Sequence, residues 1–166
     1  NSAIEYHNKA FEALEKVSVK KRRTFYERSL NDMGLMYQIQ RDHEKAILTF
    51  KKGLSSTGIK NRDINLYARL KDNLGYSLLL NGDADTAKIH LFEALNSRAQ
   101  ISDISGIVVS KLHITEYYEH INDKRKALQY AKEANTIAHL IKNSDNSHIF
   151  ALHFYLNLLY VSNNCS

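Results

Sequence analysis

Three side chains in this sequence have the spacing of a metal site. His113, Glu116 and His120 follow the pattern His-x2-Glu-x3-His, which places three ligand types on one face of a helix, within reach of one ion. The pattern differs from the His-Glu-x-x-His signature, and eight histidines are scattered along the chain, so coincidence is the favoured interpretation. We predict no metal site, and of the two roles we prefer that of a pH-sensitive groove.

Catalytic motifs are missing from the sequence. It has no glycine-rich phosphate loop, no Gly-x-Ser-x-Gly elbow and no His-Glu-x-x-His. The single cysteine, Cys165, has no neighbouring base and cannot form an intrachain disulfide. The sequence therefore predicts neither an enzyme nor a cofactor.

The densest basic cluster is the run Lys20-Lys21-Arg22-Arg23. Nucleic-acid binding would need further basic residues on neighbouring helices and aromatic residues that stack on bases. The chain has 23 basic and 18 acidic residues and a net charge of +5, which suits acidic partners without naming one. We interpret the run as a solvated helix start and keep nucleic-acid binding as a distant alternative.

Composition limits the elements that can position these side chains. The 166 residues include no proline and six glycines, and 43% are hydrophobic. These values exclude collagen-like and disordered chains, and they disfavour a β-sandwich, whose turns need more glycine and proline. No window reaches the roughly 18 uninterrupted apolar residues of a membrane span. The compartment stays open between the cytoplasm, which we favour, and an extracytoplasmic sensor domain.

A repeat governs the whole chain. Residues 31–37 (NDMGLMY) match residues 72–78 (DNLGYSL), and a third copy keeps the frame around Thr115. Alanines at positions 3, 46, 87 and 127 lie 43, 41 and 40 residues apart. Aspartates recur at expected helix starts, where a carboxylate accepts hydrogen bonds from free backbone N–H groups. They are Asp42, Asp83 and Asp123 in one series and Asp63, Asp103 and Asp145 in the other.

These signals predict eight helices in one all-α solenoid domain. The expected helices are 2–16, 20–40, 43–55, 62–81, 84–98, 104–121, 124–142 and 146–162. They form a half-repeat at 1–18, repeats at 20–58, 61–99 and 102–142, and a half-repeat at 145–166. We expect the chain to be a section of a longer protein.

The repeat resembles the tetratricopeptide repeat, whose pattern is W-x2-L-G-x2-Y…A-x3-F. The three copies are Leu30-x2-Met33-Gly34-x2-Tyr37…Ala46-x3-Phe50, Lys71-x2-Leu74-Gly75-x2-Leu78…Ala87-x3-Leu91 and Lys111-x2-Ile114-Thr115-x2-Tyr118…Ala127-x3-Ala131. The period is longer than the usual ~34 residues and the closing proline is missing. Such long units are similar to those of bacterial sensors and transcription regulators, of kinesin light chain and of spindle-orientation adaptors.

The resemblance implies an α-α superhelix whose concave groove binds a peptide or protein segment. Helical spacing places the candidate groove residues on the first helix of each repeat. They are Arg28, Asn31, Asp32, Arg69, Asn73, Tyr76, His113 and Glu116, with Leu35, Gln38, Asp72 and Leu79 on the same faces. Asn73 matches the asparagine with which long-repeat relatives hold a peptide backbone. Arg28 and Arg69 could pair with ligand carboxylates, whereas the alternative for all of them is a solvated helix face.

The resulting functional prediction is a peptide-binding or protein-binding segment of a bacterial signalling or transcription-control protein. The alternative is a scaffold for homo-oligomerisation. The expected last helix, 146–162, has apolar residues on more than one face, so we expect it to pack against another chain or a further segment.

Overall fold

The computed structural model describes residues 4–6, 8–9, 12 and 19–140, and this part of the chain is helical without a strand. The longer helices form three hairpins, which we call the first, second and third units. Their bounds are α2 (Val19–Ile39) with α3 (His43–Leu54), α5 (Ile64–Leu80) with α6 (Ala84–Gln100), and α7 (Ile104–His120) with α8 (Lys124–Leu140). A single turn, α4 (Ile59–Arg62), connects the first unit to the second.

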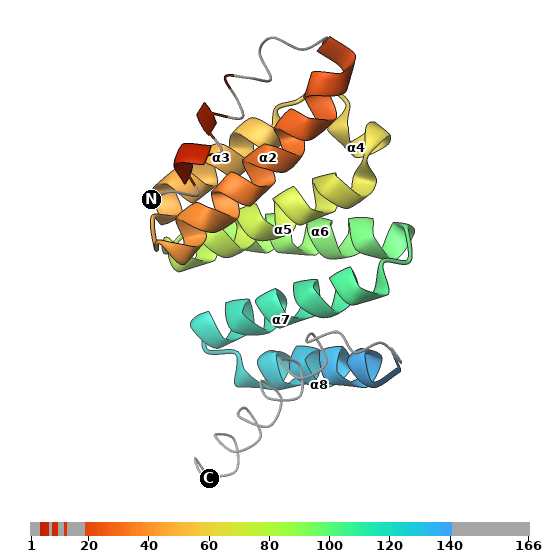
Figure 1. Ribbon diagram of the computed structural model, residues 1–166. Helices are drawn as coiled ribbons and strands as arrows, with labels where there is room; N and C mark the ends of the chain where they lie inside the picture. The colour runs from red at the N-terminus through yellow and green to blue at the C-terminus, as the bar shows by residue number, and fades with distance from the viewer. Residues whose placement is uncertain (1–3, 7, 10–11, 13–18, 141–166) are drawn as a thin grey trace.

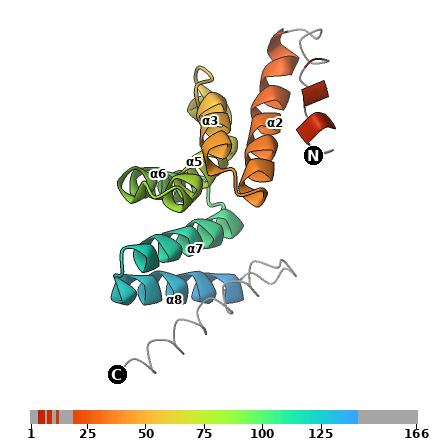
Figure 2. The same cartoon turned by 90° about the vertical axis from the view of Figure 1, so that its left-hand side faces the viewer.

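The hairpins stack in chain order into an all-α repeat superhelix (Figure 1). Each second helix packs against the first helix of the next unit, so α3 contacts α5 and α6 contacts α7. The first helices α2, α5 and α7 also contact one another in turn. In Figure 2, α2 and α3 run steeply across the direction of α7 and α8, so successive units twist. The predicted fold class is confirmed.

Five aspartates start helices as their repeat positions predict. The side chains of Asp42, Asp63, Asp83, Asp103 and Asp123 accept hydrogen bonds from the backbone N–H groups of Lys45, Leu66, Thr86, Gly106 and Lys126 at 2.9 to 3.2 Å. Each bond satisfies one donor that the first helical turn leaves free. Asp145 lies outside the described residues.

Small residues let the two helices of a unit approach closely. Ala46, Ala87 and Ala127 are fully buried between the helices. A Cβ atom added to Gly75 would lie 2.8 Å from Leu91 Cγ and 3.0 Å from the Leu91 backbone nitrogen. The small residues of the repeat motif therefore define the contact between the two helices of the unit.

The turns inside the three units share one hydrogen-bonding pattern. The backbone N–H groups of Asp42, Asp83 and Asp123 donate to the carbonyls of Tyr37, Leu78 and Tyr118 at 2.8 to 2.9 Å. The residue before each aspartate has a positive φ, with values of 60° at Arg41, 88° at Gly82 and 60° at Asn122. The sequence therefore encodes the same helix stop and restart three times, with three different residues in the left-handed position.

Most predicted helix ends agree with the structure to within two residues. The helix expected at 62–81 begins at Ile64, because Asp63 caps α5 and separates it from the single turn α4, which the sequence did not predict. The half-repeats 1–18 and 145–166 are not covered in full: only residues 4–6, 8–9 and 12 of the first are described, and none of the second, which includes the apolar helix 146–162. Within the described part of the chain, no helix is long and apolar enough to cross a membrane.

Candidate binding groove

The candidate site is the surface formed by α2, α5 and α7, which we call the first-helix face. On this face a chain of amide hydrogen bonds joins α2 to α5. Asn73 Nδ2 donates to Asn31 Oδ1 at 2.9 Å, and Asn31 Nδ2 donates to Asp32 Oδ1 at 3.3 Å. Gln38 Nε2 donates to the Asn73 carbonyl at 3.0 Å and to Ser77 Oγ at 2.7 Å. Asn73 is thus held from both its side chain and its backbone.

The buried carboxylate of Asp72 makes the corresponding connection between α5 and the third unit. Asp72 Oδ2 lies 3.2 Å from Arg98 Nη2 and 3.1 Å from His113 Nδ1, while Ser110 Oγ donates to Asp72 Oδ1 at 3.0 Å. Arg98 also donates to Ser110 Oγ at 3.1 Å and to the Gly106 carbonyl. Asp72 occupies the repeat position of Asn31, so one position connects neighbouring units twice along the array.

The charges in this cluster support one another. Burial raises the pKa of Asp72, but His113, Arg98 and the Ser110 hydroxyl outweigh burial and lower it overall. Burial likewise lowers the pKa of His113, and the adjacent Asp72 carboxylate, with Glu116, raises it overall above the ordinary 6.5. The geometry therefore favours an ionised Asp72 facing a protonated His113.

Tyr76 extends the first-helix face from the second unit to the third. Its ring stacks on that of His113 with 4.3 Å between ring centroids and 10° between planes. Burial raises the pKa of the Tyr76 hydroxyl, and the charge of Glu116 and its hydrogen bond to that hydroxyl raise it further. Tyr76 therefore stays neutral, and its half-buried side chain lies beside the polar chain.

The two predicted arginines differ in their surroundings. Arg28 Nη2 lies 3.5 Å from Asp63 Oδ2, across the gap between the first and second units. Arg69 is exposed, and within the described part of the chain its guanidinium has no hydrogen bond or ion pair. Arg69 lies one helical turn before Asn73 on α5, so both side chains are on the same side of that helix.

A pocket of about 630 Å³ opens where the C-terminal ends of α2 and α5 meet the first intra-unit turn. It is lined by Leu35, Gln38, Ile39, Arg41, His43, Tyr76 and Leu80. Three of these residues, Leu35, Gln38 and Tyr76, were predicted to face the groove. The pocket therefore continues the first-helix face at one end.

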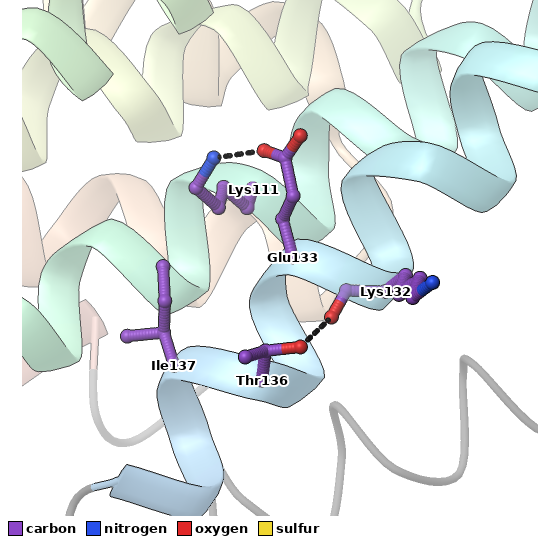
Figure 3. Close-up of a pocket in the computed structure, with 5 residues that line it drawn as sticks. All are labelled: Lys111, Lys132, Glu133, Thr136 and Ile137. Carbon is purple, nitrogen blue, oxygen red and sulfur yellow. Dashed lines mark hydrogen bonds and ion pairs between the residues drawn. The ribbon is translucent and has the colours of Figure 1, made fainter.

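A smaller hollow of about 270 Å³ lies along α7 and α8 (Figure 3). Lys111 and Glu133 bridge the two helices there at 2.5 Å, beside Lys132, Thr136 and Ile137. The ion pair repeats that of Lys71 with Glu93 in the second unit, at 2.9 Å. Because these charges already neutralise each other, the hollow offers a ligand less than the 630 Å³ pocket.

Most of the predicted groove residues lie close together in the structure, but they differ in burial and in hydrogen-bond partners. Asn31 is 1% exposed and supports Asn73, Asp72 is 0% exposed and Leu79 is 3% exposed, so the expectation that these three residues face a ligand is wrong. Asp32 is exposed, whereas Tyr76, His113 and Glu116 are partly buried. Sequence reasoning missed Arg98 on a second helix, Ser110 on α7, and Arg41 and His43 at the first intra-unit turn. These residues were missed because helical spacing along one helix does not reveal partners on other helices or in turns.

The remaining candidate residues from the sequence are the possible metal ligands, the basic run and Cys165. In the described residues no group of three or more His, Cys, Asp and Glu side chains could hold a metal ion, and His113 Nδ1 is occupied by Asp72. In the basic run, Arg23 is exposed and the side chains of residues 20–22 lie outside the description. Cys165 also lies outside the described residues.

Comparison with protein families and curated proteins identifies no relative of this chain. No protein-family model matches the sequence, and no curated protein is significantly similar to it. The resemblance to tetratricopeptide repeats therefore stays a prediction that rests on the repeat motif.

Proposed function

We propose that this chain is a scaffold that binds a peptide or an extended protein segment along the first-helix face. The observation that carries the proposal is the fixed orientation of the Asn73 amide, which hydrogen bonds with Asn31 and Gln38 hold in place. Within the described part of the chain, its Oδ1 has no hydrogen-bond partner. A fixed amide with a free acceptor suits the N–H group of a peptide backbone.

The neighbouring residues support the same function. Arg69 provides an unpaired guanidinium one turn away, which can take two hydrogen bonds from a carboxylate of the ligand. The half-buried Tyr76 lines a pocket and offers apolar contact beside a polar chain, the combination that protein-binding surfaces favour. Asn73, Arg69 and Tyr76 all lie on α5, so the second unit supplies the main contacts that we assign to the ligand.

We further propose that the binding segment belongs to a bacterial protein of signalling or transcription control. Support for this step is the long repeat period and the missing closing prolines, which resemble those of bacterial sensors and regulators. A ligand that binds across units would stiffen the twisted stack of Figure 2, which gives binding a mechanical consequence for any attached segment.

The test selects random twelve-residue peptides, displayed on phage, on the immobilised chain. Affinities of the enriched peptides are then measured by fluorescence anisotropy for the wild type and for Asn73→Ala/Arg69→Ala. We expect the double variant to bind about 10-fold to 100-fold more weakly, because it loses an amide hydrogen bond and a charged one.

The matched control is Asn96→Ala/Arg125→Ala, which removes the same two residue types from exposed positions on α6 and α8. It should bind like the wild type. Failure to enrich any peptide, or equal affinity for the two double variants, would contradict the proposed function.

A further inference from the structure

We propose that the 630 Å³ pocket binds an apolar side chain of a peptide together with an acidic side chain next to it in sequence. This inference rests on the proposed function and names the chemistry of one part of the ligand. We call this pocket the turn pocket, because the turn between α2 and α3 forms one side of it. Its volume lies within the range of about 300 to 1,000 Å³ that is usual for ligand pockets.

The apolar part of the turn pocket comes from the ends of two helices. Leu35 and Ile39 from α2 and Tyr76 and Leu80 from α5 line it. Ile39 is 83% exposed and Leu80 is 45% exposed, which is unusual for large apolar side chains in neighbouring positions. An apolar ligand side chain would remove both from water, at roughly 25 cal/mol for each Å² that is buried.

The polar part of the turn pocket selects an anion. Arg41 and His43 line it, and no carboxylate does so among the described residues. The nearest acid in sequence, Asp42, is already occupied: it lies 2.5 Å from Lys45 Nζ and caps α3. Within the described ranges the guanidinium of Arg41 has no hydrogen bond or ion pair, so its charge is available to a ligand.

The backbone gives an independent reason to assign Arg41 a binding role. Arg41 occupies the left-handed position of its turn with φ of 60°, where the equivalent turns have Gly82 and Asn122. Glycine and asparagine suit that conformation, whereas arginine adopts it at a cost. Arginine therefore brings no advantage to the turn itself, and its side chain has no partner within the described residues. Because Arg41 lines the turn pocket, we assign it a role in binding there.

The experiment repeats the phage selection on three proteins: the wild type, Arg41→Gly and Asn122→Gly. Arg41→Gly removes the charge and gives the turn the residue that the second unit already has. Asn122→Gly makes the same backbone change in the third unit, away from the pocket, and is the matched control. We expect the wild type and Asn122→Gly to enrich peptides in which Glu or Asp lies next to Leu, Ile or Phe, and Arg41→Gly to enrich peptides without this acidic preference.

Synthetic peptides then measure the contact directly. For an enriched peptide, we expect Glu→Gln to weaken binding to the wild type by about 10-fold, as for the loss of a charge-assisted hydrogen bond. The same change should alter binding to Arg41→Gly by less than about 2-fold, because the partner is already missing. Amidation of the peptide C-terminus should leave affinity unchanged, since the recognised carboxylate is that of a side chain.

The outcomes separate the inference from the proposed function. Enriched peptides without an acidic–apolar pair, or an acidic preference that persists in Arg41→Gly, would overturn the inference and leave the function standing. Sensitivity to amidation combined with indifference to Glu→Gln would also overturn it, because the ligand group would be a main-chain carboxylate. If the wild type enriches no peptide, the function fails and the inference fails with it. Thermal unfolding of Arg41→Gly at or above the wild-type temperature shows that loss of preference is not loss of fold.

Discussion

The carboxylate of Asp72 is buried on α5 between three donors from the next two helices. Arg98 comes from α6, and Ser110 and His113 come from α7. Because a buried charge is stable only when its partners are present, removing one member leaves the others without compensation. Asp72 therefore decides whether the second and third units pack as observed.

Asp72→Asn should lower the free energy of unfolding by about 3 to 5 kcal/mol, because the Arg98 guanidinium stays buried without its counter-charge. Urea unfolding followed by circular dichroism measures this change. Asp32→Asn, the same substitution at an exposed position of α2, should change stability by less than about 0.5 kcal/mol. Equal effects of the two substitutions would show that the Asp72 cluster is not structural.

His113 gives stability a dependence on pH. Its side chain is 17% exposed, and its pKa is raised in the folded state. A raised pKa stabilises the fold fully below the ordinary value of 6.5, and this stabilisation is lost as the pH rises through the folded-state pKa. The lowered pKa of Asp72 acts in the opposite direction, since its stabilisation is lost only as the pH falls below the ordinary 3.8.

We therefore expect the stability difference between the wild type and His113→Gln to be largest near pH 5.5 and to shrink towards pH 8.5. Urea unfolding of both proteins across this range measures it. The pKa of His90 is lowered, chiefly by its burial and by Lys71, and this contribution cancels because both proteins contain His90. A difference that grows with pH, or does not change, would contradict the ion pair of His113 with Asp72.

At the scale of elements, the three intra-unit turns have one backbone conformation and three different residues in the left-handed position. Gly82 adopts the positive φ without a steric penalty, Asn122 tolerates it, and Arg41 is the least suited. The turns are therefore a natural series in which local stability can be varied without changing the fold.

Arg41→Gly should raise the free energy of unfolding by up to about 1 kcal/mol, because the strain at a positive φ is relieved. The gain from Asn122→Gly should be smaller, since asparagine already tolerates the conformation. Thermal and urea unfolding of both variants measure the two gains. Destabilisation by Arg41→Gly would show that the Arg41 side chain holds the turn together.

The helix pair α5/α6 depends on the absence of a side chain at Gly75. Gly75→Ala should destabilise the chain by about 1 to 3 kcal/mol, because the new methyl group would overlap Leu91 and its backbone nitrogen. Alanine at the exposed Asn96 of α6 should be neutral or slightly stabilising, because it improves helix propensity alone. Urea unfolding compares the two, and a stable Gly75→Ala would mean that the helices can separate freely.

At the scale of the whole molecule, the main contacts among the described helices lie within a unit or between neighbouring units, so we treat stability as a sum of unit and interface contributions. The second unit has a described unit on either side, with α3 against α5 and α7 against α6. It also contributes Asp72, Asn73 and the ion pair of Lys71 with Glu93.

We expect amide hydrogen exchange to be slowest in α5 and α6, the helices of the unit that has a described unit packed on either side. Helices with packed neighbours on both sides open only when an interface is lost. Exchange followed by mass spectrometry at peptide resolution measures this order. Uniform protection from α2 to α8 would indicate a single cooperative unit in place of a linear array.

The sequence by itself determined the helices, their capping aspartates and the close approach of the two helices of a unit. These features repeat along the chain and depend on neighbours within one or two helical turns, so spacing reveals them. Gly75 and Asp83 are examples, since their tasks follow from their place in the repeat.

Only the tertiary structure decided which polar residues are available to a ligand. Helical spacing predicted that Asn31, Asp72 and Asn73 all face the groove. In the structure Asn31 and Asp72 are buried, because their side chains form hydrogen bonds with residues 38 to 42 positions away, whereas Asn73 keeps a free side-chain oxygen. The turn pocket likewise exists only because the ends of α2 and α5 meet at Arg41. Burial and partner choice depend on how units stack, and the period of a sequence does not encode that geometry.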